Sequence, residues 1–78
     1  MIEVLFPVMS KEDPTTEGVV ATWFVGDGEM VTEGQLLAEV QVDKVSQEVL
    51  APAVGVIRLL VEEEEVVRQG EAIARIEQ

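Results

Sequence analysis

Cysteine, histidine and tyrosine are all absent from this chain of 78 residues. Without cysteine, neither disulfide bonds nor thiolate metal ligands can hold the fold together, which is usual for proteins of a reducing compartment. Without histidine, the chain lacks the commonest general base, the commonest metal ligand and every catalytic triad built on an imidazole. We therefore expect a chain with no catalytic residues of its own and no metal site.

Long apolar runs and positive charge are also scarce. No apolar run approaches the roughly 20 residues of a membrane-spanning helix, and the N-terminus lacks a basic region followed by an apolar segment. Five Lys and Arg stand against 16 Asp and Glu, which gives a formal net charge of −11. Nucleic acids and anionic membranes bind clustered Lys and Arg, so we expect neither as a partner. Basic protein surfaces are the expected partners, and charge that only maintains solubility is the alternative.

The sequence does contain short apolar runs separated by Gly, Pro, Asp and Glu, a pattern typical of an all-β domain. A chain of this length forms one domain with a small core and no deep enzyme cleft. We assign residues 1–78 to a single domain, expected to be monomeric in isolation. We expect it in the cytoplasm, and the mitochondrial matrix after processing is the alternative. The predicted strands cover residues 2–6, 19–25, 36–42, 45–50, 56–61 and 72–76, with further short strands near residues 30 and 66.

The first half of the sequence recurs in the second half. EVLFP at residues 3–7 matches EVLAP at residues 48–52, and QLLAEV at residues 35–40 parallels EAIARI at residues 71–76. One half could not bury its own apolar face, so the two halves should pack as a sandwich or flattened barrel with approximate twofold symmetry. Paired glycines in the two copies, such as Gly34, indicate turns that need positive φ.

The duplication isolates an insertion in the first copy. VMSKEDPTTE, residues 8–17, separates Pro7 from Gly18, whereas the second copy has only two residues between Pro52 and Gly55. Loops held on a rigid scaffold often carry recognition, although a simply tolerated insertion is an equal alternative. The candidates for partner recognition are Met9, Ser10, Lys11, Glu12 and Asp13.

The joint between the two copies is the tetrapeptide VDKV at residues 42–45. With Asp43 and Lys44 as the two central turn residues, Val42 faces Val45 across a hairpin. The Asp-Lys pair fits a type I turn better than the primed turns, which favour glycine-containing pairs. The symmetry counterpart of this joint is the gap between the two chain termini. Lys44 should therefore project from the end of the molecule opposite the termini.

Lys44 is one of only two lysines in the chain. An exposed ammonium is a poor nucleophile, so Schiff-base catalysis is not expected. Its long stem is suited to carrying a group attached to the amine, and a merely solubilising lysine is the alternative. Lys11 competes with Lys44 as an attachment site, but it lacks a tight hairpin to present it.

Two further features have structural explanations. The acidic run at residues 62–65 corresponds to the first-copy turn at residues 26–29. It lacks the spaced oxygen ligands of an EF-hand, so a solvated turn is expected rather than a cation site. Trp23 and Phe24 are expected in one strand, one facing inward and the other outward. We expect Trp23 to pack at the core or its rim, and a role in partner docking is the alternative.

The run GQLLAEVQVDKV at residues 34–45, followed by EVLAP, resembles the lipoyl domains of dihydrolipoamide acyltransferase chains in 2-oxo acid dehydrogenase complexes. The resemblance covers essentially the whole chain and includes VGDGEMVTEG at residues 25–34. It implies two four-stranded antiparallel sheets with internal pseudo-twofold symmetry. It also implies that lipoic acid is attached covalently through Lys44, with Asp43 and Val45 recognised as parts of the turn.

The function implied by this resemblance is that of a swinging-arm carrier of acyl groups and reducing equivalents. A thiamine-diphosphate-dependent 2-oxo acid dehydrogenase would load the arm, the acyltransferase core would unload it, and dihydrolipoamide dehydrogenase would reoxidise it. A lipoylating enzyme would first attach the cofactor. The loop at residues 8–17 would lie near the lysine and help the 2-oxo acid dehydrogenase recognise the domain.

The sequence departs from the family at two positions before the lysine. Gln41 and Val42 stand where lipoyl domains commonly have Glu and then Thr or Ser. The related biotin carriers usually flank their lysine with methionines, whereas Asp43 and Val45 occupy those positions here. A biotin carboxyl carrier domain and an unmodified acidic interaction domain of the same fold remain as alternatives.

Overall fold

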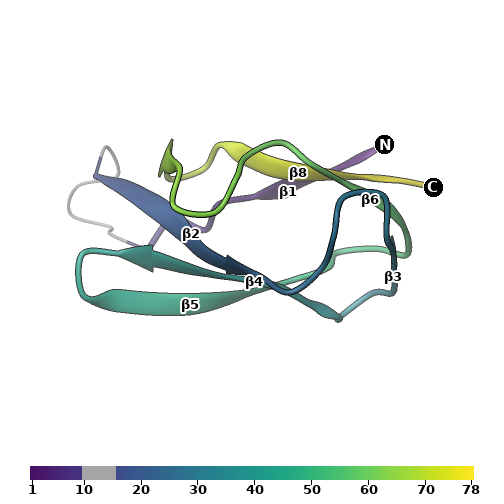
Figure 1. Ribbon diagram of the computed structural model, residues 1–78, viewed down its shortest axis with the longest axis horizontal. Coiled ribbons are helices and arrows are strands. Elements are labelled where there is room, and N and C mark those ends of the chain that lie inside the picture. The colour runs from purple at the N-terminus through teal and green to yellow at the C-terminus, as the bar shows by residue number, and fades with distance from the viewer. Residues whose placement is uncertain (10–15) are drawn as a thin grey trace.

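The computed structural model describes residues 1–9 and 16–78, which form two four-stranded antiparallel sheets (Figure 1). One sheet has the strand order β1-β8-β6-β3 and the other has the order β5-β4-β2-β7. This confirms the predicted all-β class. Within these residues, no helix has the length and apolar character to cross a membrane. The strands are β1 (Ile2–Leu5), β2 (Glu17–Trp23), β3 (Met30–Val31), β4 (Leu36–Val42), β5 (Val45–Leu50), β6 (Gly55–Leu59), β7 (Val66–Arg68) and β8 (Ala72–Glu77).

The predicted boundaries of β4 and β5 are confirmed at both ends, whereas β2 and β6 each end two residues earlier than predicted. At these two ends a carboxylate binds the backbone in place of a strand carbonyl. Glu63 accepts a hydrogen bond from the backbone N–H of Trp23 at 2.7 Å, and Asp27 accepts one from that of Leu59 at 2.8 Å. Phe24 therefore lies just outside β2. The prediction that Trp23 and Phe24 lie in one strand is wrong.

The core lies between the two sheets and takes side chains from both. The predicted inward face of β4 is confirmed, because Ala38, Val40 and Val42 are buried while the residues between them are exposed. Burial of each large apolar side chain contributes about 1.5–3 kcal/mol. The largest fully buried side chains are Phe6, Leu37, Ile57, Ile73 and Ile76.

The two halves of the sequence exchange strands, since each sheet takes two strands from each half. Matching hydrogen bonds show the twofold relation. Gly34 N–H donates to the carbonyl of Ala51, and Gly70 N–H donates to the carbonyl of Phe6, both at 2.8 Å. These two glycines have φ of 84° and 87°. This confirms the prediction that the paired glycines lie in turns that need positive φ.

The acidic run at residues 62–65 forms the turn that was predicted from its first-copy counterpart. Glu65 N–H donates to the carbonyl of Glu62 at 3.2 Å, as Glu29 N–H donates to that of Gly26 at 3.1 Å. In each turn the last carboxylate also accepts the backbone N–H of the first residue. Across residues 1–9 and 16–78, no cluster of three or more acidic side chains is placed to bind a metal ion.

The molecule is elongated, with principal extents of 34 × 19 × 18 Å. The turn between β4 and β5 lies at one end of the long axis, and both chain termini lie at the other end (Figure 1). The predicted separation of Lys44 from the termini is therefore confirmed. Because β1 pairs with β8, the two termini emerge close together from the same sheet.

Candidate functional site

The candidate site is the two-residue turn that joins β4 and β5. Asp43 and Lys44 form this turn, because the last cross-strand pair, Val42 with Val45, directly flanks them. Both side chains are exposed. The confirmed cross-strand pairs of the hairpin are Val42 with Val45, Val40 with Gln47 and Glu39 with Glu48.

The backbone of the turn differs from the sequence prediction. A type I turn has negative φ at both central residues, but Asp43 has φ of 53°, so the type I prediction is wrong. Positive φ at the first central residue belongs to the primed turns, whose twist matches that of the paired strands. Aspartate occupies this region more readily than most side chains do. The turn thus continues the twist of the hairpin up to Lys44.

Lys44 stands clear of the body of the domain. Val45 beside it is 60% exposed, whereas Val42, the residue before the turn, is only 3% exposed. The core therefore ends at Val42, and the turn itself lies in solvent. Among the described residues, no hydrogen bond or ion pair engages the Lys44 amine. Lys44 is exposed to solvent, and the paired strands β4 and β5 beneath it hold the turn in place.

A small hollow of about 180 Å³ adjoins the turn and is lined by Met9, Val42, Asp43 and Val45. Met9 is half-buried and packs against the core. The start of the inserted loop therefore lies beside the lysine turn, as the family resemblance implied. The other four loop candidates lie outside the described residues: Ser10, Lys11, Glu12 and Asp13.

Gln69, which was not among the residues predicted from the sequence, holds the inserted loop near both of its ends. Its Oε1 accepts a hydrogen bond from the backbone N–H of Met9, and its Nε2 donates to the carbonyl of Thr16, both at 2.6 Å. Gln69 is only 9% exposed, whereas its symmetry counterpart Glu33 is exposed. The sequence signal for this role was the difference between the two copies, Glu at position 33 and Gln at position 69. Position 69 contacts the first copy, which is the copy that contains the insertion.

Comparison with known proteins identifies the family. The family model described as "Biotin-requiring enzyme" matches residues 3–76. The solution structure of the lipoyl domain of the 2-oxoglutarate dehydrogenase complex from Azotobacter vinelandii aligns with a TM-score of 0.80 at 33% identity. That alignment covers 100% of this chain and 98% of the other.

Two curated relatives are whole acyltransferase components. The succinyltransferase component of the 2-oxoglutarate dehydrogenase complex of Staphylococcus saprophyticus is 37% identical over 95% of this chain and 17% of that protein. The acetyltransferase component of the pyruvate dehydrogenase complex of Zymomonas mobilis is 41% identical over 94% of this chain and 17% of that protein. The chain therefore spans less than a fifth of the length of these relatives.

The chain belongs to the family of biotinyl and lipoyl carrier domains, and within it to the lipoyl domains of 2-oxo acid dehydrogenase acyltransferases. Membership implies lipoic acid attached to a lysine. The residues around Lys44 fit such a group, because an exposed amine adjoins a hollow whose lining includes Met9, Val42 and Val45. Apolar side chains of this kind can contact the hydrocarbon part of an attached chain.

Proposed function

We propose that this domain is a non-catalytic swinging-arm carrier that holds lipoic acid in amide linkage on Lys44. It moves acyl groups and reducing equivalents between the active sites of a 2-oxo acid dehydrogenase complex. The observation that carries this proposal is the exposed Lys44 amine on a two-residue hairpin, at the end of the long axis opposite the termini. Lys11, the other lysine, lies outside the described residues.

The chain contributes position rather than reactive groups. The attached lipoic acid supplies disulfide chemistry that a chain without cysteine cannot supply. The paired strands β4 and β5 hold the attachment point, and the primed turn directs the lysine outward from them. Any polypeptide joined to either terminus leaves from the far end, so tethering raises the local concentration of the arm without covering the lysine.

The proposed partners are the enzymes of such a complex. A thiamine-diphosphate-dependent 2-oxo acid dehydrogenase, the acyltransferase core and dihydrolipoamide dehydrogenase each have to reach the arm, and a lipoylating enzyme has to grip the turn. Asp43 and Val45 are exposed on either side of Lys44 and are the proposed recognition residues for that enzyme. The names of the relatives support this set of partners, and we propose the cytoplasm as the place of action.

The test is enzymatic lipoylation followed by intact mass spectrometry. The chain is incubated with lipoate ligase, lipoate and ATP, alongside the variants Lys44→Arg and Lys11→Arg. We expect one lipoyl group on the original chain and on Lys11→Arg, and none on Lys44→Arg. Modification that persists in Lys44→Arg would refute the assignment of the site.

A parallel incubation with biotin ligase, biotin and ATP separates the carrier types. We expect no biotin on the chain, because neither neighbour of Lys44 is methionine. Efficient biotinylation with no lipoylation would instead support a biotin carboxyl carrier. If neither ligase modified the folded chain, the carrier proposal would be wrong, and an unmodified interaction domain would take its place.

A further inference from the structure

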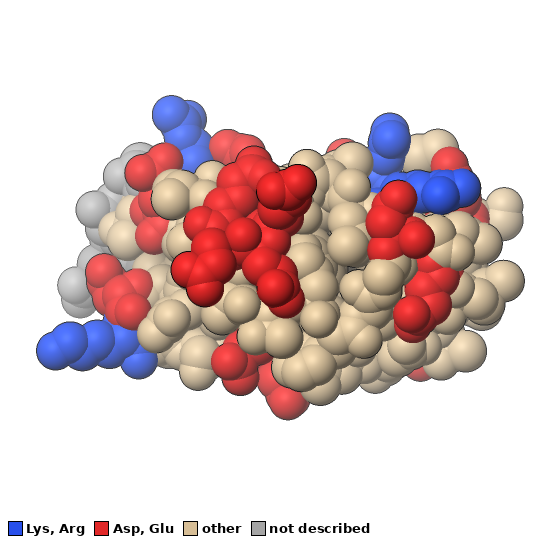
Figure 2. Space-filling model, in the orientation of Figure 1, with Lys and Arg blue, Asp and Glu red and all other residues tan. Residues whose placement is uncertain are grey.

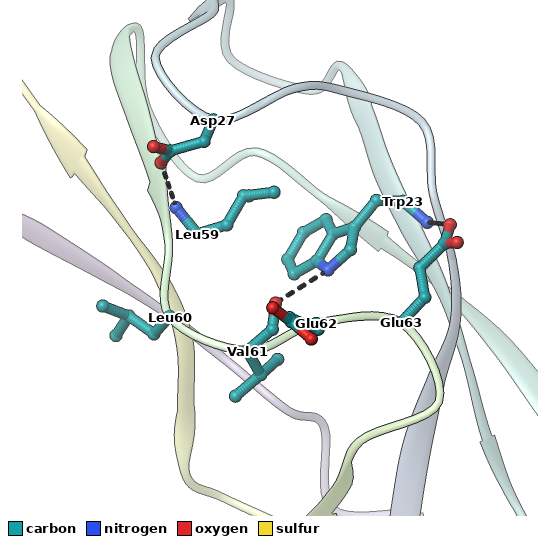
Figure 3. Close-up of a pocket in the computed structure, with 7 residues that line it drawn as sticks. All are labelled: Trp23, Asp27, Leu59, Leu60, Val61, Glu62 and Glu63. Carbon is teal, nitrogen blue, oxygen red and sulfur yellow. Dashed lines mark hydrogen bonds between the residues drawn. The ribbon is translucent and has the colours of Figure 1, made fainter.

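A second hollow, of about 640 Å³, lies away from the lysine turn at the ends of β2 and β6 (Figure 3). We call it the Trp23 hollow. Two symmetry-related pairs of residues border it, since Trp23 corresponds to Leu59 and Asp27 corresponds to Glu63. The hollow thus lies where the two halves of the molecule meet. Its lining is Trp23, Asp27, Leu59, Leu60, Val61, Glu62 and Glu63.

The two halves are not equivalent at this point, because one supplies an indole ring where the other supplies a leucine. Trp23 is half-buried, and its Nε1–H donates to the carbonyl of Val61 at 3.1 Å, which fixes the plane of the ring. In Figure 3 the ring lies within the hollow, between the side chain of Leu59 and the segment that carries Glu62. An aromatic ring held by its own hydrogen bond at an open hollow offers a preformed surface to a ligand.

Carboxylates surround this aromatic and aliphatic floor. Asp27 and Glu63 each accept one backbone N–H, which fixes their positions and leaves further lone pairs available. Arg58 forms an ion pair with Glu77, and no ion pair within the described residues involves an acid that lines the hollow. The face drawn in Figure 2 carries acidic side chains in several places, the largest group near its centre, with uncharged surface between them.

An indole ring among unpaired carboxylates is complementary to a cation with an apolar stem. Trp is the strongest aromatic partner for a cation, and a guanidinium can stack on the ring while it bonds carboxylates. We propose that the Trp23 hollow docks an arginine side chain from a basic segment of a partner protein. The guanidinium stacks on Trp23 and bonds Glu62 or Asp27, and the arginine stem contacts Leu59.

This docking site is separate from the proposed carrier site, because none of the residues that line it also lines the hollow beside Lys44. Arginine binding should therefore be the same in the original chain, the lipoylated chain and the variant Lys44→Arg. If the carrier proposal failed, the docking proposal would still stand. If the docking proposal failed, the carrier proposal would still stand.

The single tryptophan of the chain allows a direct test. An acetylated peptide of four Arg-Gly repeats is titrated into the ¹⁵N-labelled chain while the Trp23 indole N–H signal and the fluorescence are followed. We expect saturable changes in both, concentrated at the residues that line the hollow. The matched peptide with citrulline in place of arginine should bind at least about 10-fold more weakly, because it lacks the charge.

Two charge variants make the test specific. Glu62→Gln removes a charge at the hollow, and Glu71→Gln removes an exposed charge outside it. Circular dichroism verifies that both variants remain folded. We expect Glu62→Gln to weaken arginine-peptide binding several-fold more than Glu71→Gln does. Equal losses in the two variants would mean nonspecific attraction to an acidic surface and would overturn the proposal.

Other occupants are also distinguished. If the indole signal shifted with protein concentration alone, the hollow would be a contact between two copies of the chain, and the proposal would be wrong. It would be equally wrong if a peptide with leucine in place of arginine bound as tightly. The absence of any saturable shift with the arginine peptide would refute it directly.

Discussion

Gln69 offers a sharp test of how the inserted loop is anchored. The substitution Gln69→Ala removes the hydrogen bonds that its side chain makes with the described ends of the loop, at the N–H of Met9 and the carbonyl of Thr16. A typical intramolecular hydrogen bond contributes about 0.5–1.5 kcal/mol to stability, so we expect a loss of about 1–3 kcal/mol. For a domain of this size, each kcal/mol lowers the melting temperature by about 4–8 °C.

The exposed counterpart Glu33 supplies the matched control. Glu33→Ala alters the same position of the other copy, where no loop needs an anchor, and should change stability by less than about 0.5 kcal/mol. A third variant, Gln69→Glu, places the first-copy residue at the anchor. Its carboxylate can still accept the N–H of Met9 but cannot donate to Thr16, so its stability should lie between those of the other two variants.

Thermal unfolding followed by circular dichroism and hydrogen exchange at Met9 measure this prediction. We expect Gln69→Ala to unfold at a lower temperature than Glu33→Ala and to lose protection at the Met9 amide. Lipoylation of Lys44 should still proceed, because the pairing of β4 with β5 holds the turn without Gln69. If the proposed recognition role of the loop is correct, reductive acylation by the 2-oxo acid dehydrogenase should fall as well. Equal melting temperatures and an unchanged Met9 amide would refute the anchoring role.

Three further predictions concern the turn, the core and the charge. Asp43→Val should cost about 1–3 kcal/mol in urea unfolding, because a β-branched residue resists φ of 53°, whereas a cost no larger than that of Asp43→Asn would contradict this. Gly18→Ala should cost at least about 1–3 kcal/mol, since its Cβ would lie 2.6 Å from Cζ of Phe6 and 2.7 Å from a backbone oxygen of β4. Gly26→Ala, with nothing within 4 Å, is its control, and equal stability of the two would refute the packing argument. Lipoylation of Lys44 removes one positive charge from a chain at −11, so the modified form should run farther toward the anode on a native gel, and unchanged mobility after confirmed modification would count against an exposed ammonium.

Much of the fold could be predicted because its signals are local. Alternating apolar residues fixed the two hairpin strands and their register, and the internal repeat located the lysine turn opposite the termini. The features that were missed depend on contacts between distant segments. The ends of β2 and β6 are set by carboxylates 40 and 32 residues away in the chain, and Gln69 reaches Met9 across 60 residues.

The backbone of the lysine turn was missed for a different reason. Turn statistics favour glycine where φ is positive, so Asp-Lys was assigned to a type I turn. In the folded domain, β4 and β5 are paired along their whole length, and the twist of that pairing determines the conformation of the two residues between them. The pairing of the strands outweighed the local preference of Asp43.

The strand order also bears on how the chain folds. Among the strands of the described residues, β4 and β5 are the pair that are both consecutive in sequence and adjacent in a sheet. Every other pairing has to close a longer loop, and the pairing of β1 with β8 joins the two ends of the chain. Folding nuclei should therefore form first at this hairpin, so the segment that presents Lys44 would take shape early and the N-terminal strand would dock late.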